Sequence, residues 1–199
     1  MGLDFKLIKG QTPLDEEEKE GLLISTITSR EELDEHEQLN IQEAIKWMLG
    51  RNFKRKEILT EDFIKQVHKK MYGDVWGWAG EFRRTNKNIG VDRFQIPTQL
   101  RTLLDDCNFW IDQNTYPPDE IAIRFKHRIV QIHCFPNGNG RHSRMMGDLI
   151  VEHIFNRDVF SWGSRGNLIQ EGTARERYIA AVKAANENNI TPLLEFSRA

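Results

Sequence analysis

Cysteine is scarce in this chain: its 199 residues contain only two, Cys107 and Cys134, and neither belongs to a CxxC pair. This argues against a disulfide scaffold. No segment approaches the run of about 18 apolar residues that a transmembrane helix needs. The N-terminus, MGLDFKLIKG, lacks the order of a charged and then an apolar stretch that is typical of a signal peptide. We therefore expect a cytoplasmic protein of one domain, long enough to bury a core.

An excess of one charge is also missing, since 28 basic residues face 30 acidic ones and the net charge is −2. The sequence therefore gives no reason to expect a nucleic acid or a membrane as a partner. A DNA-binding helical domain would rest on helical content alone. The balance does not exclude a local basic site.

Apolar residues recur at helical spacing along most of the chain, and the predicted class is therefore all-α. Ser29 precedes the first long helix, Thr60 is a suitable N-cap for the next one, and Thr191 is a suitable N-cap for the last, with Pro192 at its first helical position. Residues 82–96 lack helical periodicity and contain Asn-Lys-Asn and a glycine, which predicts a short β-hairpin. The acidic run at 15–20 predicts a solvated helix start or loop. The expected helices cover about 30–48, 61–72, 119–133, 140–155, 174–187 and 191–198, and a further helix begins at Pro97 or Thr98 and is broken at Pro117-Pro118.

Residues 133–144, HCFPNGNGRHSR, gather groups that suit phosphate chemistry. Glycines that lead into a helix leave backbone N–H groups free to hold an anion, and the helix dipole adds to the attraction. Arg141 and Arg144 are three residues apart on the first turn and can hold phosphate oxygens in bidentate fashion. Asn137 offers an oxygen to Mg²⁺. His133 can accept a proton near neutral pH.

These groups together suit transfer from a nucleotide onto a hydroxyl. A helix N-cap surrounded by surface charges is the structural alternative. Cys134, beside the candidate base, is interpreted as a buried apolar residue and not a nucleophile. His127 is interpreted as a core or surface histidine and not a metal ligand.

The same segment resembles the signature of the Fic family, HxFx(D/E/N)GNGRxxR, throughout. The resemblance spans about residues 30–196, and the opening of the chain is similar to the bacterial Fic subgroup called mobile mystery protein B. It implies the Fic fold, a helical bundle with a short β-hairpin flap over the active site. The implied domains are an N-terminal extension at 1–29 and a Fic domain at 30–199, with the flap at about 84–97 and the motif at 133–144. Further similar segments are Trp78–Arg83, Asn88–Pro97, Phe160–Gly163, Arg175–Tyr178 and Ala184–Asn186.

The resemblance implies a protein adenylyltransferase, an enzyme that moves AMP from ATP to a Tyr, Ser or Thr hydroxyl of a target protein and releases pyrophosphate. The best-studied Fic motif carries Asp or Glu where this chain has Asn137, and the amide has no charge, so weaker Mg²⁺ binding is expected. This difference leaves open the transfer of another phosphate-linked group. It also leaves open a weakly active or silent module that binds a nucleotide or a partner.

Carried over residue by residue, the resemblance makes His133 the base, Phe135 a core anchor and Asn137 the metal ligand. The groups expected to bind the phosphates are Gly138, Asn139, Gly140, Arg141 and Arg144. Ile89 and Gly90 of the flap, with Tyr178 and Asn186, are expected beside the rest of the nucleotide, although Tyr178 can also be explained as a core residue. The flap is expected to dock the target protein by strand pairing, or else to be an ordinary surface hairpin.

Many Fic proteins are inhibited by a glutamate from an (S/T)xxxE(G/N) helix, which pairs with the second motif arginine, here Arg144. No segment of this chain has that pattern complete. Glu37 and Glu32 are the candidates for a degenerate version, with Glu37 expected to reach Arg144. Alternatively, a separate antitoxin-like protein supplies the glutamate.

Overall fold

The computed structural model describes residues 15–163 and 172–199. All the predicted helices form, and two short helices, α1 and α3, join them. The last turn after α7 is a π-helix at Ile150–Ile154, and a 3₁₀ turn at Arg93–Gln95 precedes α5. The α-helices are α1 Glu16–Lys19, α2 Arg30–Leu49, α3 Arg55–Ile58, α4 Glu61–Tyr72, α5 Ile96–Asp112, α6 Pro118–Ile132, α7 Asn139–Leu149, α8 Thr173–Asn186 and α9 Thr191–Arg198.

The N-cap predicted at Thr60 forms, whereas the one predicted at Thr191 does not, because Ile190 takes the N-cap position and Thr191 is the first residue of α9. The Ser29 hydroxyl accepts the N–H of Glu32 at 3.2 Å, and the Glu32 carboxylate accepts the N–H of Ser29 at 3.1 Å, which completes a capping box at α2. Thr60 accepts the N–H of Phe63 at the start of α4. Such caps satisfy N–H groups that have no partner inside the helix and fix where it begins.

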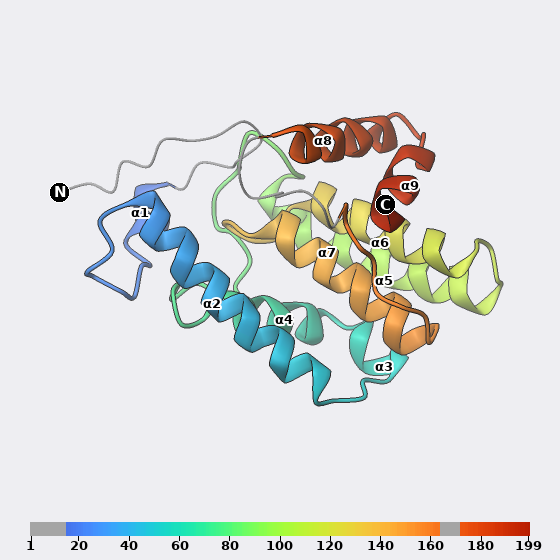
Figure 1. Ribbon diagram of the computed structural model, residues 1–199, viewed down its shortest axis with the longest axis horizontal. Helices are drawn as coiled ribbons and strands as arrows, with labels where there is room; N and C mark the ends of the chain where they lie inside the picture. Colours follow the sequence, from blue (N-terminus) through green and yellow to red (C-terminus); the bar gives the residue numbers. More distant parts are fainter. Residues whose placement is uncertain (1–14, 164–171) are drawn as a thin grey trace.

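The helices pack in an order that places the segment between α6 and α7 near the centre of the molecule (Figure 1). α6 packs against α5, α7 and α9, while α4 packs against α2 and α7. α8 and α9 pack against each other. α2 and α8 therefore lie on opposite sides of α7 in the view of Figure 1.

The core is built from apolar stripes of these helices. Ile64, Val67 and Met71 of α4 are fully buried, as is Phe125 of α6. Burying a side chain of this size contributes about 1.5–3 kcal/mol of stability. The apolar stripes of these helices thus hold the bundle together.

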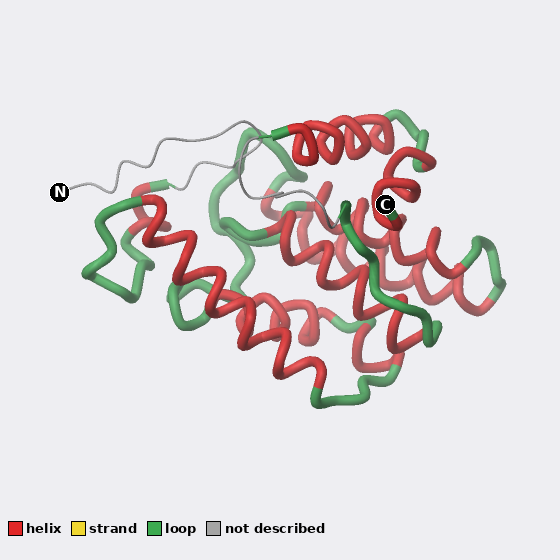
Figure 2. Tube along the Cα trace, in the orientation of Figure 1, coloured by secondary structure: helices red, strands yellow, loops and turns green. Residues whose placement is uncertain are grey.

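The structure does not show the predicted β-hairpin at residues 82–96: no strand is present among the described residues (Figure 2). The segment is a loop held by side chains. Arg83 donates to the backbone carbonyls of Thr85, Val91 and His133, and Arg93 donates to that of Arg84. Guanidinium groups thus occupy carbonyls that a strand ladder would have used, which explains why the chain turns here without strand pairing.

The N-terminal segment contacts this loop. The side chain of Lys87 is buried and forms ion pairs with Asp15 at 3.0 Å and Glu18 at 2.5 Å. Thr85 donates its hydroxyl to Asp15 at 2.5 Å. The acidic run that predicted a solvated segment thus contributes Asp15 and Glu18 to contacts with the flap segment.

No helix in the described part of the chain has both the length and the apolar character needed to cross a bilayer.

Candidate active site

The motif loop, residues 133–138, joins α6 to α7 through two residues in the left-handed region. His133 ends α6 at φ 58°, and Gly138 precedes α7 at φ 77°. A Cβ at Gly138 would lie 2.6 Å from the Tyr72 ring, so only glycine fits there. The loop is therefore fixed in shape at both ends.

The side chain of Asn139 braces this loop. Its Oδ1 accepts the N–H of Phe135 at 2.9 Å, and its Nδ2 donates to the carbonyl of Phe135 at 2.7 Å. Because both amide groups are engaged inside the protein, the phosphate contact predicted for Asn139 is left to its backbone N–H. Phe135 is fully buried, as predicted for an anchor.

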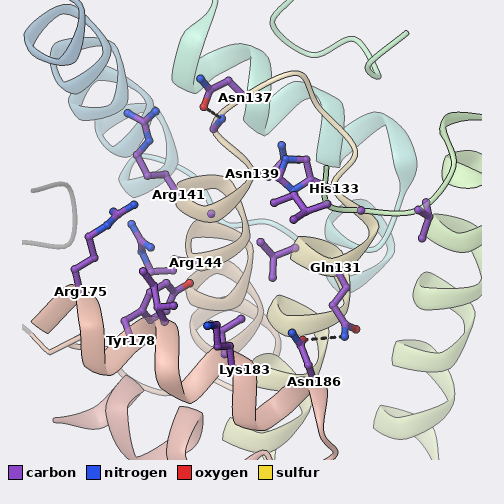
Figure 3. A pocket seen from close by; sticks show the side chains of 18 of the residues that line it. Gln131, His133, Asn137, Asn139, Arg141, Arg144, Arg175, Tyr178, Lys183 and Asn186 are labelled. Carbon is purple, nitrogen blue, oxygen red and sulfur yellow. Dashed lines mark hydrogen bonds between the residues drawn. The ribbon is translucent and has the colours of Figure 1, made fainter. Parts of the chain in front are cut away.

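A pocket of about 640 Å³ opens in front of the motif loop (Figure 3). α2, the flap segment, α6, the motif with α7, and α8 all contribute to its wall. The lining residues are Arg30, Asp34, Ile89, Gly90, Val91, Val130, Gln131, His133, Asn137–Arg141, Arg144, Arg175, Tyr178, Ile179, Val182, Lys183 and Asn186. The structure therefore brings every predicted catalytic, metal and nucleotide-binding residue to one cavity.

Positive charge dominates this pocket. Arg141 and Arg144 of α7 and Arg175 and Lys183 of α8 all line it (Figure 3). Asp34 is the one carboxylate among the described lining residues. Such a wall favours a polyanion such as a triphosphate.

No role is predicted from the sequence for two of these cations, Arg175 and Lys183. Their spacing along α8 could have identified them. They line the pocket together with Tyr178, Val182 and Asn186. The spacing of these residues places them on one face of α8.

His133 is almost fully buried at the pocket wall. Burial lowers the pKa of His133 to about 4, and the nearby charges of Arg83 and Lys87 act in the same direction. The imidazole is therefore neutral at pH 7, the protonation state that a proton acceptor needs.

The amide of Asn137 turns back onto its own loop. Its Oδ1 accepts the N–H of Gly138 at 2.6 Å, a contact visible in Figure 3. The predicted metal ligand and one predicted phosphate donor are thus bonded to each other. A Cβ at Gly140, by contrast, would meet no atom within 4 Å, so the space in front of this residue is open.

Tyr178 lies between two cations. Arg144 Cζ lies 5.3 Å and Lys126 Nζ 4.7 Å from the centroid of its ring. Burial alone would raise the pKa of Tyr178, but the charges of Lys126 and Arg144 lower it to about 8. Tyr178 therefore supports Arg144 at the pocket wall and is not merely a core residue.

Asn186 is held by α6. Its Oδ1 accepts from Gln131 Nε2 at 3.0 Å and lies 2.8 Å from His127 Nε2. The interpretation of His127 as a core histidine is confirmed, because the ring is buried and bonded to this amide. Cys134 is fully buried, and burial raises its pKa to about 12, so its interpretation as an inert thiol is confirmed as well.

Glu37 reaches the motif, but the prediction that it pairs with Arg144 is wrong. Its Oε2 lies 2.5 Å from Nη2 of Arg141, and its Oε1 accepts the indole N–H of Trp76 at 2.7 Å. Burial is the largest single effect and works to lower the pKa of Arg141. The charge and hydrogen bond of Glu37, together with Tyr72 and Asp34, outweigh it, and the pKa is raised. Arg144 lies one turn further along α7, against Tyr178 of α8.

Glu32 does not reach either motif arginine. Its carboxylate accepts the backbone N–H groups of Thr28 and Ser29, at 2.8 and 3.1 Å, in the first turn of α2. Glu32 caps the helix, and because its carboxylate is held there, the prediction that Glu32 is the inhibitory glutamate is wrong.

Comparison with known proteins agrees with this geometry. Residues 58–151 match the model of the Fic/DOC family. Curated relatives include "Protein adenylyltransferase Fic" from Aedes aegypti, 26% identical over 169 residues, and from Drosophila grimshawi, 28% identical over 169 residues. These alignments cover 82% of this chain but 32% and 33% of the relatives. The chain thus spans about a third of the length of the curated relatives it matches.

Solved structures show the same fold. Fic-1 (residues 134–508) from C. elegans has a TM-score of 0.69 at 20% identity, with 90% of this chain and 51% of that chain covered. The N-terminal Fic domain of Bep8 from Bartonella sp. 1-1C has a TM-score of 0.69 at 13% identity, covering 87% and 88%. A Fic domain from Bartonella quintana with bound ADP has a TM-score of 0.63 at 16% identity, covering 87% and 86%. The fold of the described chain is therefore that of these Fic domains.

Proposed function

We propose that this chain is a protein adenylyltransferase, which transfers AMP from ATP to a hydroxyl of a target protein. The observation that carries the proposal is the convergence of neutral His133, the motif arginines and the open backbone at Gly140 on one cationic pocket. The names of the curated relatives support the same activity.

In the proposed reaction, the hydroxyl oxygen of the target forms a bond to the α-phosphorus of ATP while the bond from that phosphorus to the bridging oxygen of the β-phosphate breaks. His133 takes the hydroxyl proton, and pyrophosphate leaves. Arg141 holds the departing phosphates and Arg144 the γ-phosphate. The backbone N–H groups of Asn139 and Gly140 stabilise the charge that develops, and that of Gly138 joins them when Asn137 turns to the metal.

The base and ribose are proposed to lie between the flap segment and α8. Ile89 and Gly90 line one side of the pocket, and Tyr178 and Asn186 line the other. Tyr178 offers a ring next to Arg144, and the Asn186 amide is already oriented by α6. A nucleobase between these elements would place its triphosphate toward the motif.

The motif supplies few oxygen ligands, so it suits Mg²⁺ only if the nucleotide supplies most of the ligands of the ion. Asn137 lines the pocket with one neutral oxygen, and the described residues contain no group of three His, Cys, Asp or Glu side chains that could hold a metal. Asn137 would be the protein ligand, and the ion would neutralise phosphate charge.

The target protein is proposed to dock on the flap segment, where Ile89 is about half exposed. An extended target segment that pairs with the backbone of residues 88–91 would bring its hydroxyl toward His133. This pairing would supply the strand that the described residues of the flap do not form themselves. No nucleic acid or membrane is proposed as a partner, and the proposed location is the cytoplasm.

Control of the enzyme is proposed to come from Glu37. Since Arg141 is the residue assigned to the departing phosphates, its pairing with Glu37 competes with productive ATP binding. Because Glu37 already pairs with Arg141, a separate antitoxin-like protein would not need to supply a glutamate there, although it could still supply one to Arg144. Assignment to the mobile mystery protein B subgroup depends on the opening of the chain, where residues 1–14 lie outside the described part, and it stays a prediction.

The second candidate is a weakly active or silent Fic module, and the bond between Asn137 Oδ1 and Gly138 N favours it because the two groups satisfy each other. Incubation of a bacterial lysate with the protein and ATP labelled at either the α- or the γ-phosphate separates the two. AMP transfer predicts protein labelling from α-labelled ATP alone, and none with His133→Ala. Labelling from neither nucleotide, while ATP still binds, would favour the silent module.

A further inference from the structure

His68, near the middle of α4, contacts two separate backbone segments through its two ring nitrogens. Nδ1 lies 3.0 Å from the backbone nitrogen of Gly80, and Nε2 lies 3.1 Å from the carbonyl oxygen of Asn137. A backbone N–H can only donate and a carbonyl can only accept. The ring must therefore accept at Nδ1 and donate from Nε2, which only the neutral Nε2–H tautomer can do.

The surroundings of His68 keep this tautomer in place. The side chain is fully buried, so water does not compete for either ring nitrogen. The ring stacks on Phe135 with 3.7 Å between centroids and 19° between planes. Protonation would turn the acceptor at Nδ1 into a donor facing the N–H of Gly80.

The two segments that His68 joins both lead to the candidate base. Gly80, at φ 84°, belongs to the turn before Arg83, and Arg83 donates to the carbonyl of His133 at 2.7 Å. On the other side, the Asn137 carbonyl belongs to the peptide bond that joins Asn137 to Gly138, and both residues line the pocket. His68 thus connects both flanks of the motif loop to α4.

We propose that His68 is a positioning residue for the transfer reaction: as a neutral ring it fixes the Asn137 carbonyl and so the backbone that faces the phosphates. This inference rests on the proposed function, since the positioned groups are those assigned to bind ATP. His68 itself does not line the described pocket and acts through the loop.

Three variants separate the contacts that His68 makes. His68→Gln places an amide N–H near the position of Nε2 and keeps the donor to Asn137. His68→Asn places an oxygen near Nδ1 and keeps the acceptor for Gly80. His68→Phe keeps an aromatic ring against Phe135 and loses both bonds. Each is assayed for kcat and KM of AMP transfer, for thermal unfolding, and for amide hydrogen exchange in the motif loop.

Because loss of positioning commonly costs on the order of 10-fold to 100-fold in rate, kcat should fall by that amount in His68→Phe and His68→Asn, with KM changed less than kcat. The motif-loop amides should exchange at least about 10-fold faster in both variants. His68→Gln should stay much nearer to the wild type in kcat and exchange, even where its melting temperature falls as far as that of His68→Asn. Equal losses in His68→Gln and His68→Asn, or wild-type kcat in a folded His68→Phe, would overturn the proposal.

One further measurement, like the unfolding and exchange experiments, does not depend on activity. Nitrogen-15 NMR of the imidazole rings in the wild-type protein should show His68 as the neutral Nε2–H tautomer at pH 7. A charged ring or the Nδ1–H tautomer would contradict the positioning role. If the wild type labels no protein at all, the proposed function fails, while the tautomer and the exchange rates still decide whether His68 holds the motif loop.

Discussion

The ion pair between Glu37 and Arg141 predicts that removing one negative charge from α2 raises the rate of the proposed AMP transfer. Glu37→Gln is the sharpest change, because a glutamine oxygen can still accept the indole N–H of Trp76 while the charge that holds Arg141 is gone. The side chain of Glu37 is 2% exposed and that of Arg141 is 19% exposed, so the pair is buried on one side and open to the pocket on the other.

A pair in this setting gives a coupling free energy of about 1–2 kcal/mol against a competing phosphate, less than for a fully buried pair. Since 1.36 kcal/mol is a factor of ten, AMP transfer at limiting ATP should rise about 5-fold to 30-fold in Glu37→Gln. Stability should fall by about 1 kcal/mol, because Arg141 loses its carboxylate. The assay is the initial rate of labelling from α-labelled ATP, with auto-modification as substrate.

Glu32→Gln is the matched control. It removes the same charge from the same helix, and a glutamine at this position can still complete the capping box. Its transfer rate should equal that of the wild type. Equal rates in all three proteins would refute the argument that Glu37 restrains Arg141 and would point to a separate inhibitor or to none.

Three further predictions concern the motif and its histidines. Gly138→Ala should lower the free energy of unfolding by about 2 kcal/mol or more, because φ 77° and the 2.6 Å approach of the Tyr72 ring exclude a Cβ. Gly140→Ala should leave the free energy of unfolding unchanged and weaken ATP binding. Equal melting curves for the two variants would contradict this. Asn137→Asp should lower the Mg²⁺ concentration at half-maximal activity, and an unchanged midpoint would show that Asn137 does not touch the metal. Burial lowers the pKa values of both His133 and His142 from 6.5 to about 4. Between these two pH values the unfolded chain therefore binds more protons than the folded protein. The free energy of unfolding should fall as the pH falls from about 6.5 to about 4, by up to about 3 kcal/mol for each ring. Urea denaturation over that range checks this, and a flat profile would contradict it.

The features predicted correctly from sequence are those encoded by neighbouring residues. The capping signal at Ser29 and the cap at Thr60 fix helix starts within a few residues of themselves. The motif at 133–144 is one continuous segment, so its arrangement around the start of α7 followed from local geometry.

The features predicted wrongly depend on contacts between distant segments. Residues 82–96 have a composition typical of a hairpin, but the carbonyls of this segment are bound by the side chains of Arg83 and Arg93. Glu37 was expected at Arg144 and instead lies on Arg141, since the packing of α2 on α4 sets which turn of α7 it faces. The contact of Lys87 with Asp15 and Glu18 joins segments about 70 residues apart and has no local signal.

The central claim is that His133 serves the chemical step in a pocket whose other groups bind ATP. It is tested most directly by measuring the single-turnover rate of AMP transfer and the dissociation constant of ATP for the wild type and for His133→Ala. The account predicts that the rate falls by on the order of 100-fold or more while the dissociation constant changes by less than about threefold. A rate within a few fold of the wild type, or a rate lost only in proportion to ATP affinity, would contradict it.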